Sequence, residues 1–568
     1  MEYKISNSAK KVTLGVAAVG LVFLIIGLFQ QKDFVYAKKI NDHSIEVKYN
    51  GKAGEEKQQE LKEAMISKMH GYNLEFHDGS HHAEDTHHVT INSEAHAAMI
   101  ESTQIQGHSD KHHPDHFETT VNNDNSTIAI VESNLTNHGE HDAHSIEDAN
   151  HDSHEDHGHH GPTFLWKVHL SHVADESNHG TGHDESGADQ LVEMISDGDI
   201  AFFDSGFRRF WSNLLVNGFF FFGISLGALF YLALHYATES GWGVVLLRIL
   251  EGIMSALPIG MVVLAIVFIA GSFGAHHIYA WMDPEITDPN SSHFDPIIYG
   301  KKAYLNLPFF WIRVLAYFTV FYLFLRWFKK KSKQEDSEGG TETHFKMYRR
   351  AALFLVFFAV FSSTMSWDFI MSIDAHWFST LFGWYCFSGI WLSGMIMVMM
   401  ITLYLRKAGY LPFVNESHIH DVGKWMFALS FLWSYLWFSQ FMLIWYSNIP
   451  EEVIYYTQRI GNYRHLFFGT FIVNFFFPMV FLMSADTKRS AGYLIVIGLV
   501  IFIGHWFDVF NMVMPGTLFD QWGLGLLEIG MFMFFLGTFV YTVLKAITKS
   551  PLLQKNHPFL EERKHHEF

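Results

Sequence analysis

Ten apolar segments dominate this sequence and constrain its fold more than any other feature. Each approaches or exceeds the roughly 20 residues that an α-helix needs to cross the hydrocarbon core of a bilayer. The chain has 568 residues, and 49% of them are hydrophobic. The sequence therefore predicts an all-α fold, a polytopic membrane helical bundle of about ten transmembrane helices. The segments span residues 13–29, 212–234, 244–270, 307–328, 348–372, 380–405, 420–446, 464–483, 489–513 and 521–544.

Lysine and arginine gather in alternate loops, which predicts the orientation of the bundle. One side receives the N-terminal lysines, the cluster from Arg326 to Lys333 and the basic C-terminal tail. By the positive-inside rule, both termini are then cytoplasmic, and we expect a multi-pass protein of a bacterial inner membrane. A few basic residues fall on the other side, among them Arg209, Arg459 and Arg464. We expect these at helix ends, where long basic side chains reach the interface.

A polar insert separates the first segment from the other nine. Residues 31–205 hold 24 of the 37 histidines and supply much of the net charge of −19. An acidic surface argues against nucleic acid as a partner. We therefore divide the chain into an N-terminal transmembrane helix (1–30), a periplasmic His-rich insert (31–205), a transmembrane bundle (206–545) and a cytoplasmic tail (546–568).

Parts of the insert have the pattern of folded structure, whereas its centre does not. Residues 45–49 and 127–132 are predicted as strands, and residues 55–70 are predicted as an amphipathic helix. Residues 138–160 contain almost no apolar side chains and suggest a solvated loop. Its imidazoles form either a polar spacer or a weak zinc or copper buffer, since no two-plus-two ligand spacing stands out. The candidate weak metal ligands are His151, His154, His157, His159 and His160.

The cysteine and histidine usage limits the cofactors that the chain can hold. Cys386 is the only cysteine, which excludes a cysteine-bound iron-sulfur cluster, a thiol-attached haem and an internal disulfide. His235 and His420 are the one pair whose depth would suit a transmembrane b haem. The histidines are too few at any one depth for a haem-copper oxidase. We therefore expect a membrane part without a bound redox cofactor.

Ionisable residues inside the apolar segments are the main candidates for function, because a charge at the bilayer centre costs about 3 kcal/mol on insertion scales. They fall into two layers, so that one layer could serve each face of the membrane. The outer layer contains Arg313, Asp368, Asp374, His376, His505, Asp508 and Glu528. The inner layer contains Arg248, Glu251, His420 and Asp421.

Three of these groups carry more specific hypotheses. His505 and Asp508 are three residues apart and share a helix face, so the carboxylate can orient the imidazole for proton transfer. The alternative is that the pair only joins two helices. Arg248 and Glu251 have the same spacing and favour a structural ion pair. Glu528 has no charged neighbour along the chain, which makes it a candidate proton carrier.

Three stretches carry a family resemblance. They are WDFIMSIDAHWFSTLFGWY, HDVGKWMFALSFLWSYLWFSQFMLIWYSNIPEE and GHWFDVFNMVMPG, in this order along the chain. Together they resemble the second large membrane subunit of bacterial alternative complex III, often called ActF. That subunit belongs to the polysulfide-reductase-type, or NrfD-like, membrane anchors. The resemblance covers about residues 206–545 and does not extend to the insert.

The resemblance implies an integral subunit of a menaquinol:cytochrome c (electron acceptor) oxidoreductase that is not catalytic alone. The partner subunits would be a multihaem cytochrome c, an iron-sulfur protein and a second NrfD-like anchor, which hold the haem c and the iron-sulfur clusters. A terminal oxidase and lipids are further candidate partners, and menaquinone is the candidate ligand. The outer layer would then form a quinone or proton-exit site, and the inner layer a proton path.

Two other functions remain open from the residues alone. A secondary transporter of metal or other ions would need liganding residues near the midplane and broken helices in both halves, and Pro258 supplies only one clear break. A structural scaffold would use every buried charge to join helices.

Overall fold

The computed structural model describes residues 2–30, 34–41, 44–50, 62–63, 65–67, 69, 72–78, 163–172, 191, 206–291, 294–518 and 522–562. The chain divides into two compact units. Met1–Phe34 and Ala201–Phe568 form a helical unit, and Val35–Ile200 form a second unit.

Among its described residues, the helical unit contains 10 helices that are long and apolar enough to cross a membrane, which confirms the predicted number. All ten predicted segments overlap one of these spans. The spans are Asn7–Leu28, Arg208–Ala237, Trp242–Ser272, Leu307–Glu338, Glu342–Ile373, Leu381–Lys407, Glu416–Ser447, Arg464–Phe481, Ala491–Leu518 and Leu526–Ile547.

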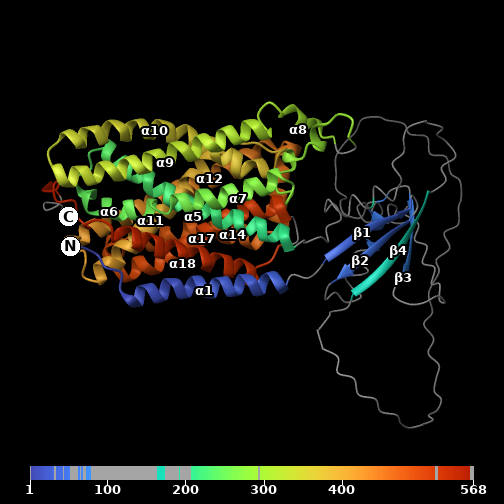
Figure 1. The fold of residues 1–568 in the computed structure, drawn as a ribbon, viewed down its shortest axis with the longest axis horizontal. Helices are drawn as coiled ribbons and strands as arrows, with labels where there is room; N and C mark the ends of the chain where they lie inside the picture. Colours follow the sequence, from blue (N-terminus) through green and yellow to red (C-terminus); the bar gives the residue numbers. More distant parts are fainter. Residues whose placement is uncertain are drawn as a thin grey trace, which may run out of the picture. The chain divides into compact units, whose positions relative to one another are not determined.

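The long helices lie side by side along one common axis (Figure 1). Both chain ends lie at one end of this bundle, called the termini end below, and the short helix α8 lies at the other, called the α8 end. The helices are α1 (Asn7–Gln30), α5 (Gly206–Ala237), α6 (Leu247–Met254), α7 (Leu257–Ser272), α8 (Pro296–Gly300), α9 (Leu307–Glu338), α10 (Glu342–Phe369), α11 (Leu381–Lys407), α12 (Glu416–Ser447), α13 (Pro450–Gly461), α14 (Arg464–Phe471), α15 (Phe477–Phe481), α16 (Ala485–Arg489), α17 (Ala491–Leu518) and α18 (Leu526–Ile547).

Helices α5 and α11 form the centre of the bundle. Helix α5 packs against α6, α7, α10, α11, α17 and α18, and it is apolar on almost every face, as a helix enclosed by others requires. The peripheral helices expose large apolar side chains, such as Val12 on α1, Ile312 on α9 and Val480 on α15. Such a surface suits contact with lipid.

Three spans depart from regular α-helix. The third breaks at Ser255 and Ala256, between α6 and α7, and α7 begins with Pro258 in its first turn. The eighth contains a π-helical turn, η5 (Ile472–Phe476), between α14 and α15. The ninth, α17, carries Pro515 inside the helix. Proline removes a backbone hydrogen-bond donor, and π-turns are frequent at functional sites.

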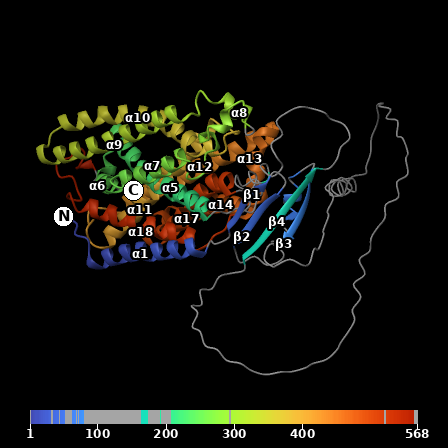
Figure 2. The same cartoon turned by 45° about the vertical axis from the view of Figure 1, so that its right-hand side comes forward.

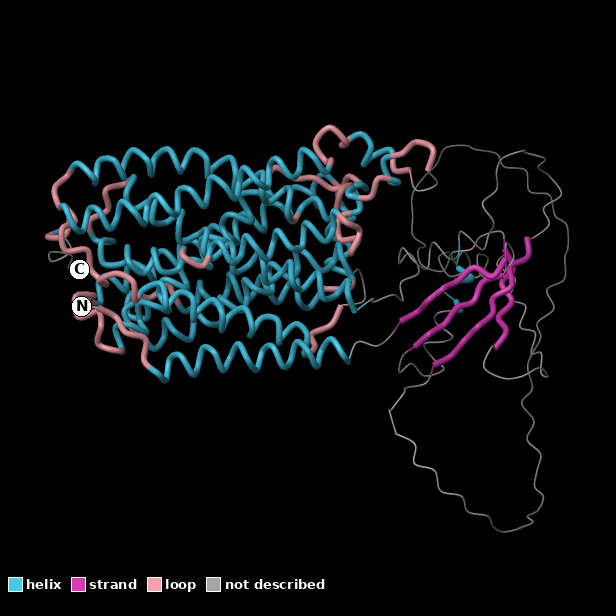
Figure 3. Tube along the Cα trace, viewed as in Figure 1, coloured by secondary structure: helices cyan, strands magenta, loops and turns pink. Residues whose placement is uncertain are grey.

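The described part of the second unit is a four-stranded sheet, drawn in magenta in Figure 3. Its strands β1 (Phe34–Asn41), β2 (Ser44–Asn50), β3 (Tyr72–Asp78) and β4 (Thr163–His172) have the order β1-β2-β4-β3, and both β2 and β3 run antiparallel to β4. Alternate residues on one face are buried, namely Ile45, Val47, Leu74, Val168 and Leu170.

The sheet confirms part of the sequence-based prediction for the insert. Strand β2 covers the predicted strand 45–49. The all-α class therefore holds for the helical unit, and the insert adds an antiparallel sheet. The predicted strand 127–132, most of the helix 55–70 and the His tract with its five candidate ligands lie outside the described residues.

Helices α1 and α18 approach each other so closely that their backbones touch. A Cβ atom added at Gly20 would lie 2.3 Å from Phe534 N, and one at Gly530 would lie 2.4 Å from Leu24 N. Both distances are far below van der Waals contact. Small residues permit this close packing. Lipid tails are as apolar as leucine, so in a membrane such packing, and not the hydrophobic effect, drives helices to associate.

We expect Gly20→Val to destabilise the helical unit by about 1–3 kcal/mol, because the added side chain separates α1 from α18. Thermal unfolding of the detergent-purified chain measures this loss. Gly15→Val is the matched control on the same helix, since a Cβ atom at Gly15 meets nothing within 4 Å. Equal losses in the two variants would show that the backbone contact is not the cause.

Candidate functional site

A buried carboxylate on α17, Asp508, lies where α11, α12 and α17 meet. The Tyr385 hydroxyl donates a short hydrogen bond to Oδ1, and Trp433 Nε1 donates one to Oδ2 at 2.9 Å. Asp508 is only 2% exposed. Within the described part of the chain, no lysine or arginine forms an ion pair with it. Its carboxylate is therefore held by two neutral donors.

His505 is the only basic side chain among the described residues that lies within ion-pair range of Asp508. Its Nδ1 atom lies 3.8 Å from Asp508 Oδ2, which is too long for a hydrogen bond. Both ring nitrogens are buried and have no hydrogen-bond partner. The predicted pair of His505 and Asp508 therefore does share a face. Asn511, three residues further along α17, donates its side-chain amide to Thr470 Oγ1 at 3.1 Å.

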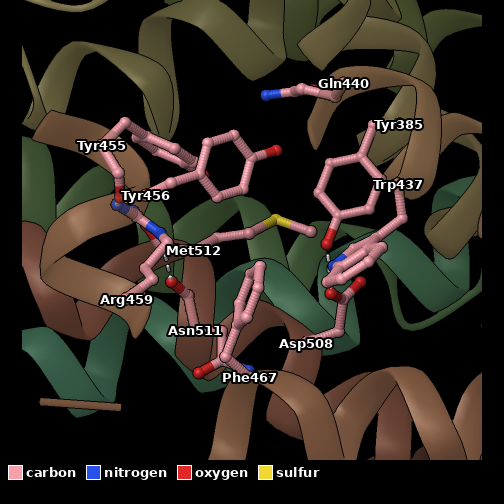
Figure 4. Close-up of a pocket in the computed structure, with 10 residues that line it drawn as sticks. All are labelled: Tyr385, Trp437, Gln440, Tyr455, Tyr456, Arg459, Phe467, Asp508, Asn511 and Met512. Atoms are coloured by element: carbon pink, nitrogen blue, oxygen red, sulfur yellow. Dashed lines mark hydrogen bonds between the residues drawn. The ribbon is translucent and has the colours of Figure 1, made fainter. Parts of the chain in front are cut away.

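Asp508 and Met512 line both of two small cavities. Cavity 1 has room for about one or two water molecules between aromatic and polar side chains (Figure 4). Its lining residues are Tyr385, Trp437, Gln440, Tyr455, Tyr456, Arg459, Phe467, Asp508, Asn511 and Met512. Cavity 2 is of similar size and is lined by residues that include Phe219, Cys386, His505, Asp508 and Met512.

The positions of the two cavities follow from the helices that line them. Cavity 1 takes residues from α13, which lies at the α8 end in Figure 2. Cavity 2 takes residues from the middle of α5 and α11. Asp508 is thus the shared wall of one space near the α8 end and one in the bundle interior. A proton-accepting side chain at such a wall can exchange protons with either side.

Arg459 lines cavity 1 and donates a hydrogen bond to a carbonyl of α17 that Pro515 leaves without its helical donor. Proline has no N–H, so the carbonyl of Asn511, four residues earlier, loses its helical donor. Arg459 Nε donates to Asn511 O at 3.1 Å, and its Nη2 atom donates to Met512 O at 3.2 Å. The same nitrogen binds Asp374 Oδ2 at 3.2 Å. The expectation that Arg459 reaches the membrane interface is wrong, since it is 1% exposed.

The predicted outer residues Asp374 and His376 belong to different contacts. Asp374 joins the Arg459 cap, whereas His376 is exposed and pairs with Asp295. Burial would raise the pKa of Asp295, but hydrogen bonds from Ile298 N and His376 outweigh it and hold that pKa below its ordinary value. Lys301 Nζ also donates to His376 O at 3.0 Å. His376 therefore fastens the loop that contains α8.

Asp368 and Arg313 form a compensated pair between α10 and α9. Arg313 Nε and Nη2 donate to the two carboxylate oxygens, each at 2.8 Å, and the Tyr317 hydroxyl donates to Oδ2 at 2.8 Å. The guanidinium also lies 3.9 Å from the ring centroid of Tyr304. This fork geometry satisfies both charges within the bundle. The sequence marks both residues as outer candidates but does not pair them.

Glu528 does not stand alone as its sequence neighbours suggest. Arg209 on α5 donates to Oε1 at 2.7 Å and to Oε2 at 2.9 Å. Asn213 Nδ2 adds a bond to Oε1 at 2.9 Å, and the backbone N–H of Gly525 donates to Oε2 at 2.8 Å. The carboxylate caps the start of α18 and ties it to α5. The premise that made Glu528 a proton carrier, the lack of a partner, is therefore wrong.

The inner candidates form two separate sets of contacts. Arg248 Nη1 donates to Glu251 Oε2 at 2.8 Å, which confirms the expected pair, and Ser332 Oγ makes a short bond to the other oxygen of Glu251. Asp421 binds Lys424 Nζ at 2.5 Å and lies 3.9 Å from His420 Nδ1. Each carboxylate has its own cation, so the predicted inner path is two local clusters.

Sequence reasoning missed several residues that the site depends on. Tyr385 and Trp433 are ordinary aromatic residues in the sequence, and nothing local marks them as donors to Asp508. Asn474 is fully buried in the π-turn, and neither its Oδ1 nor its Nδ2 atom has a hydrogen-bond partner. A Cβ atom at Gly504 would lie 2.1 Å from Asn474 Oδ1, so this amide packs beside His505. A polar residue within an apolar run was the available signal.

The chain matches no protein-family model. No curated protein matches it either. The resemblance stated from the three sequence stretches therefore stays an expectation.

We expect Asp368→Asn and Asp508→Asn to differ in stability, because only Asp368 balances a buried cation. Asp368→Asn leaves the Arg313 guanidinium unpaired and should cost about 3–5 kcal/mol. Asp508→Asn keeps an acceptor for Tyr385 or Trp433 and should cost about 1 kcal/mol. Thermal unfolding in detergent compares the two isosteric variants. Equal losses would contradict the distinction between a compensated and an uncompensated carboxylate.

Arg459 should stabilise the fold through its hydrogen bonds to the backbone carbonyls near Pro515. Arg459→Met should destabilise the chain by about 3 kcal/mol, since it frees two buried carbonyls and Asp374. In a Pro515→Ala background the loss should be about 1 kcal/mol smaller, because the alanine supplies the missing N–H to Asn511 O. A double-mutant cycle of unfolding measures this coupling, and exposed Arg464→Met is the control. Strict additivity would show that Arg459 does not replace the proline's missing bond.

Proposed function

We propose that this chain is an integral membrane subunit of a quinol-oxidising respiratory complex, and that Asp508 is its proton-transfer group. One observation carries the proposal: Asp508 is a buried carboxylate with only neutral donors, placed between two cavities. Burial of an ionisable group in a membrane bundle is costly and marks proton or ion paths. The sequence resemblance supplies the type of complex.

The other buried carboxylates in the two candidate layers serve as the comparison. Asp368, Glu528 and Glu251 each bind a guanidinium group directly. Taking up a proton would break these ion pairs and leave a buried cation. At Asp508 a proton breaks no ion pair, and His505 Nδ1, 3.8 Å away, is an unfilled acceptor for the next step. Of these four carboxylates, Asp508 therefore takes up a proton at the lowest cost in free energy.

The side chains that line cavity 1 are of the types that would contact the head group of a quinol, the proposed proton donor. Its walls include the rings of Trp437 and Tyr456, which can flank a planar ring, and Gln440 Oε1 has no hydrogen-bond partner. In Figure 4 the Gln440 amide and the Tyr385 hydroxyl border the same space. Oxidation of menaquinol to menaquinone releases two protons and two electrons. Asp508 takes one proton and passes it to His505, which frees the carboxylate to take the second proton, and the two electrons pass to an iron-sulfur or haem acceptor on a partner subunit.

The charge clusters at the termini end have a structural role in this proposal. Arg248 joins Glu251 to Asp336 on α9 at 3.2 Å, and Ser332 connects the same helices. These contacts hold α6 against α9 in the apolar interior. We assign the inner layer to helix association, and the outer ion pairs of Asp368 and Glu528 likewise.

Replacing the proposed proton acceptor should stop turnover without preventing assembly. We expect Asp508→Asn to lower quinol oxidation by the purified complex about 100-fold, the usual size of a general-base contribution. The turnover number should fall while the apparent affinity for quinol stays, because the isosteric amide keeps the shape of the site. Exposed Asp486→Asn is the control. Unchanged oxidation and proton release in an assembled Asp508→Asn complex would make the chain a scaffold.

The type of complex needs a separate test. A tagged chain purified in mild detergent should bring multihaem and iron-sulfur subunits with it, and the preparation should oxidise quinol. Haem spectra, iron content and mass spectrometry of the partners measure this. A chain that emerges without redox partners would contradict the respiratory proposal and favour a transporter.

A further inference from the structure

A second cluster of chemically active side chains lies at the termini end and has no part in the proposed proton transfer. Glu335 on α9, His344 on α10 and His557 in the C-terminal segment each offer one ligand atom, and these atoms all lie within 4.8 Å of one another. All three residues are buried. No other group of three His, Cys, Asp or Glu residues in the described ranges is this close.

The fold assembles this cluster from three places in the sequence. A tight turn between α9 and α10 contains Gly339 and Gly340 at φ 68° and 79°, values that favour glycine. This turn brings His344 Nδ1 to 3.1 Å from Glu335 Oε1. The turn thus fixes two of the three ligand groups on the two helices.

The C-terminal segment is led to the same place by its own hydrogen bonds. Gln554 Nε2 donates to Ser332 Oγ at 2.5 Å, and Lys555 N donates to Asp336 Oδ1 at 2.8 Å. These bonds hold the segment along α9, two residues before His557. His557, the third ligand group, therefore lies on a C-terminal segment that is held against α9.

The surroundings have the features of a ligand site. Tyr236 donates to Glu335 Oε2 at 3.2 Å, which orients the carboxylate and leaves Oε1 toward the histidines. His344 Nε2 and His235 Nε2 are buried and have no hydrogen-bond partner. Both rings line a cavity of about the size of one water molecule, together with His557. Buried, unpartnered imidazole nitrogens around a small polar space are costly unless they bind something.

We propose that Glu335, His344 and His557 form a binding site for a divalent metal ion of the zinc type. Two imidazoles and one carboxylate are a ligand set that Zn²⁺ favours, with the fourth position open to water. Binding through His557 gives up one weak contact, the hydrogen bond from Phe559 N to Nδ1 at 3.2 Å. Because the ligands come from two helices and the tail, the ion fastens the C-terminal segment to the bundle.

The first test is metal content. The full-length chain in detergent is equilibrated with Zn²⁺ and a competing chelator, desalted and assayed for bound zinc. We expect His557→Gln and Glu335→Gln to hold one zinc ion fewer per chain than the unmodified protein. His376→Gln, an exposed histidine at the α8 end, should lose none. The histidines of the insert are present in all four proteins, so their contribution cancels. Equal zinc content in all four would overturn the proposal.

A second measurement needs no substitution and so does not depend on a variant that folds. Hydrogen exchange of residues 549–562 is followed in the unmodified chain with Zn²⁺ and with a chelator. Zinc should slow exchange in this segment about tenfold at a concentration about ten times its dissociation constant. Identical exchange under both conditions would show that no metal fastens the tail. Neither readout involves quinol oxidation, so both are independent of the proposed respiratory role.

Discussion

A charge buried in an apolar bundle must be balanced, and three of the six buried carboxylates among the described residues, Glu251, Asp368 and Glu528, bind guanidinium groups. Arg209, Arg248, Arg313 and Arg459 each bind a carboxylate on another turn, helix or loop. These pairs fix how α5, α6, α9, α10, α13 and α18 meet. Asp508 stands apart, because Tyr385 and Trp433 hold it without a cation. Its environment favours a change of protonation state over permanent charge.

A buried backbone carbonyl also needs a hydrogen-bond partner, and two irregular helices near the site reflect this kind of local adjustment. Pro515 leaves the carbonyl of Asn511 without its helical donor, and Arg459 supplies one. The cap positions Arg459 at the wall of cavity 1 and ties the loop of Asp374 to α17. On the other side, the π-turn that carries Asn474 packs against Gly504, next to His505. Two local defects in the helices thus lie on either side of the Asp508 pair.

The sequence predicted the architecture well because hydrophobic length is a local property. All ten spans were visible as apolar runs, and the i, i+3 spacing correctly predicted the Arg248–Glu251 pair and the shared face of His505 and Asp508. The partners of Glu528 and Asp368 were not predictable, since Arg209 and Arg313 lie 319 and 55 residues away along the chain. Glu528 has no charged neighbour along the chain, yet in the folded structure Arg209 binds both of its carboxylate oxygens. The cluster of Glu335, His344 and His557 was hidden for the same reason.

The central claim is that Asp508, unlike Asp368, gains and loses a proton in the folded chain. Infrared difference spectroscopy of the purified chain across a pH change tests it most directly, through the C=O stretching band of a protonated carboxyl group. We predict a band that titrates in the unmodified protein, persists in Asp368→Asn and disappears in Asp508→Asn. A band that survives Asp508→Asn, or no titrating band at all, would contradict the claim.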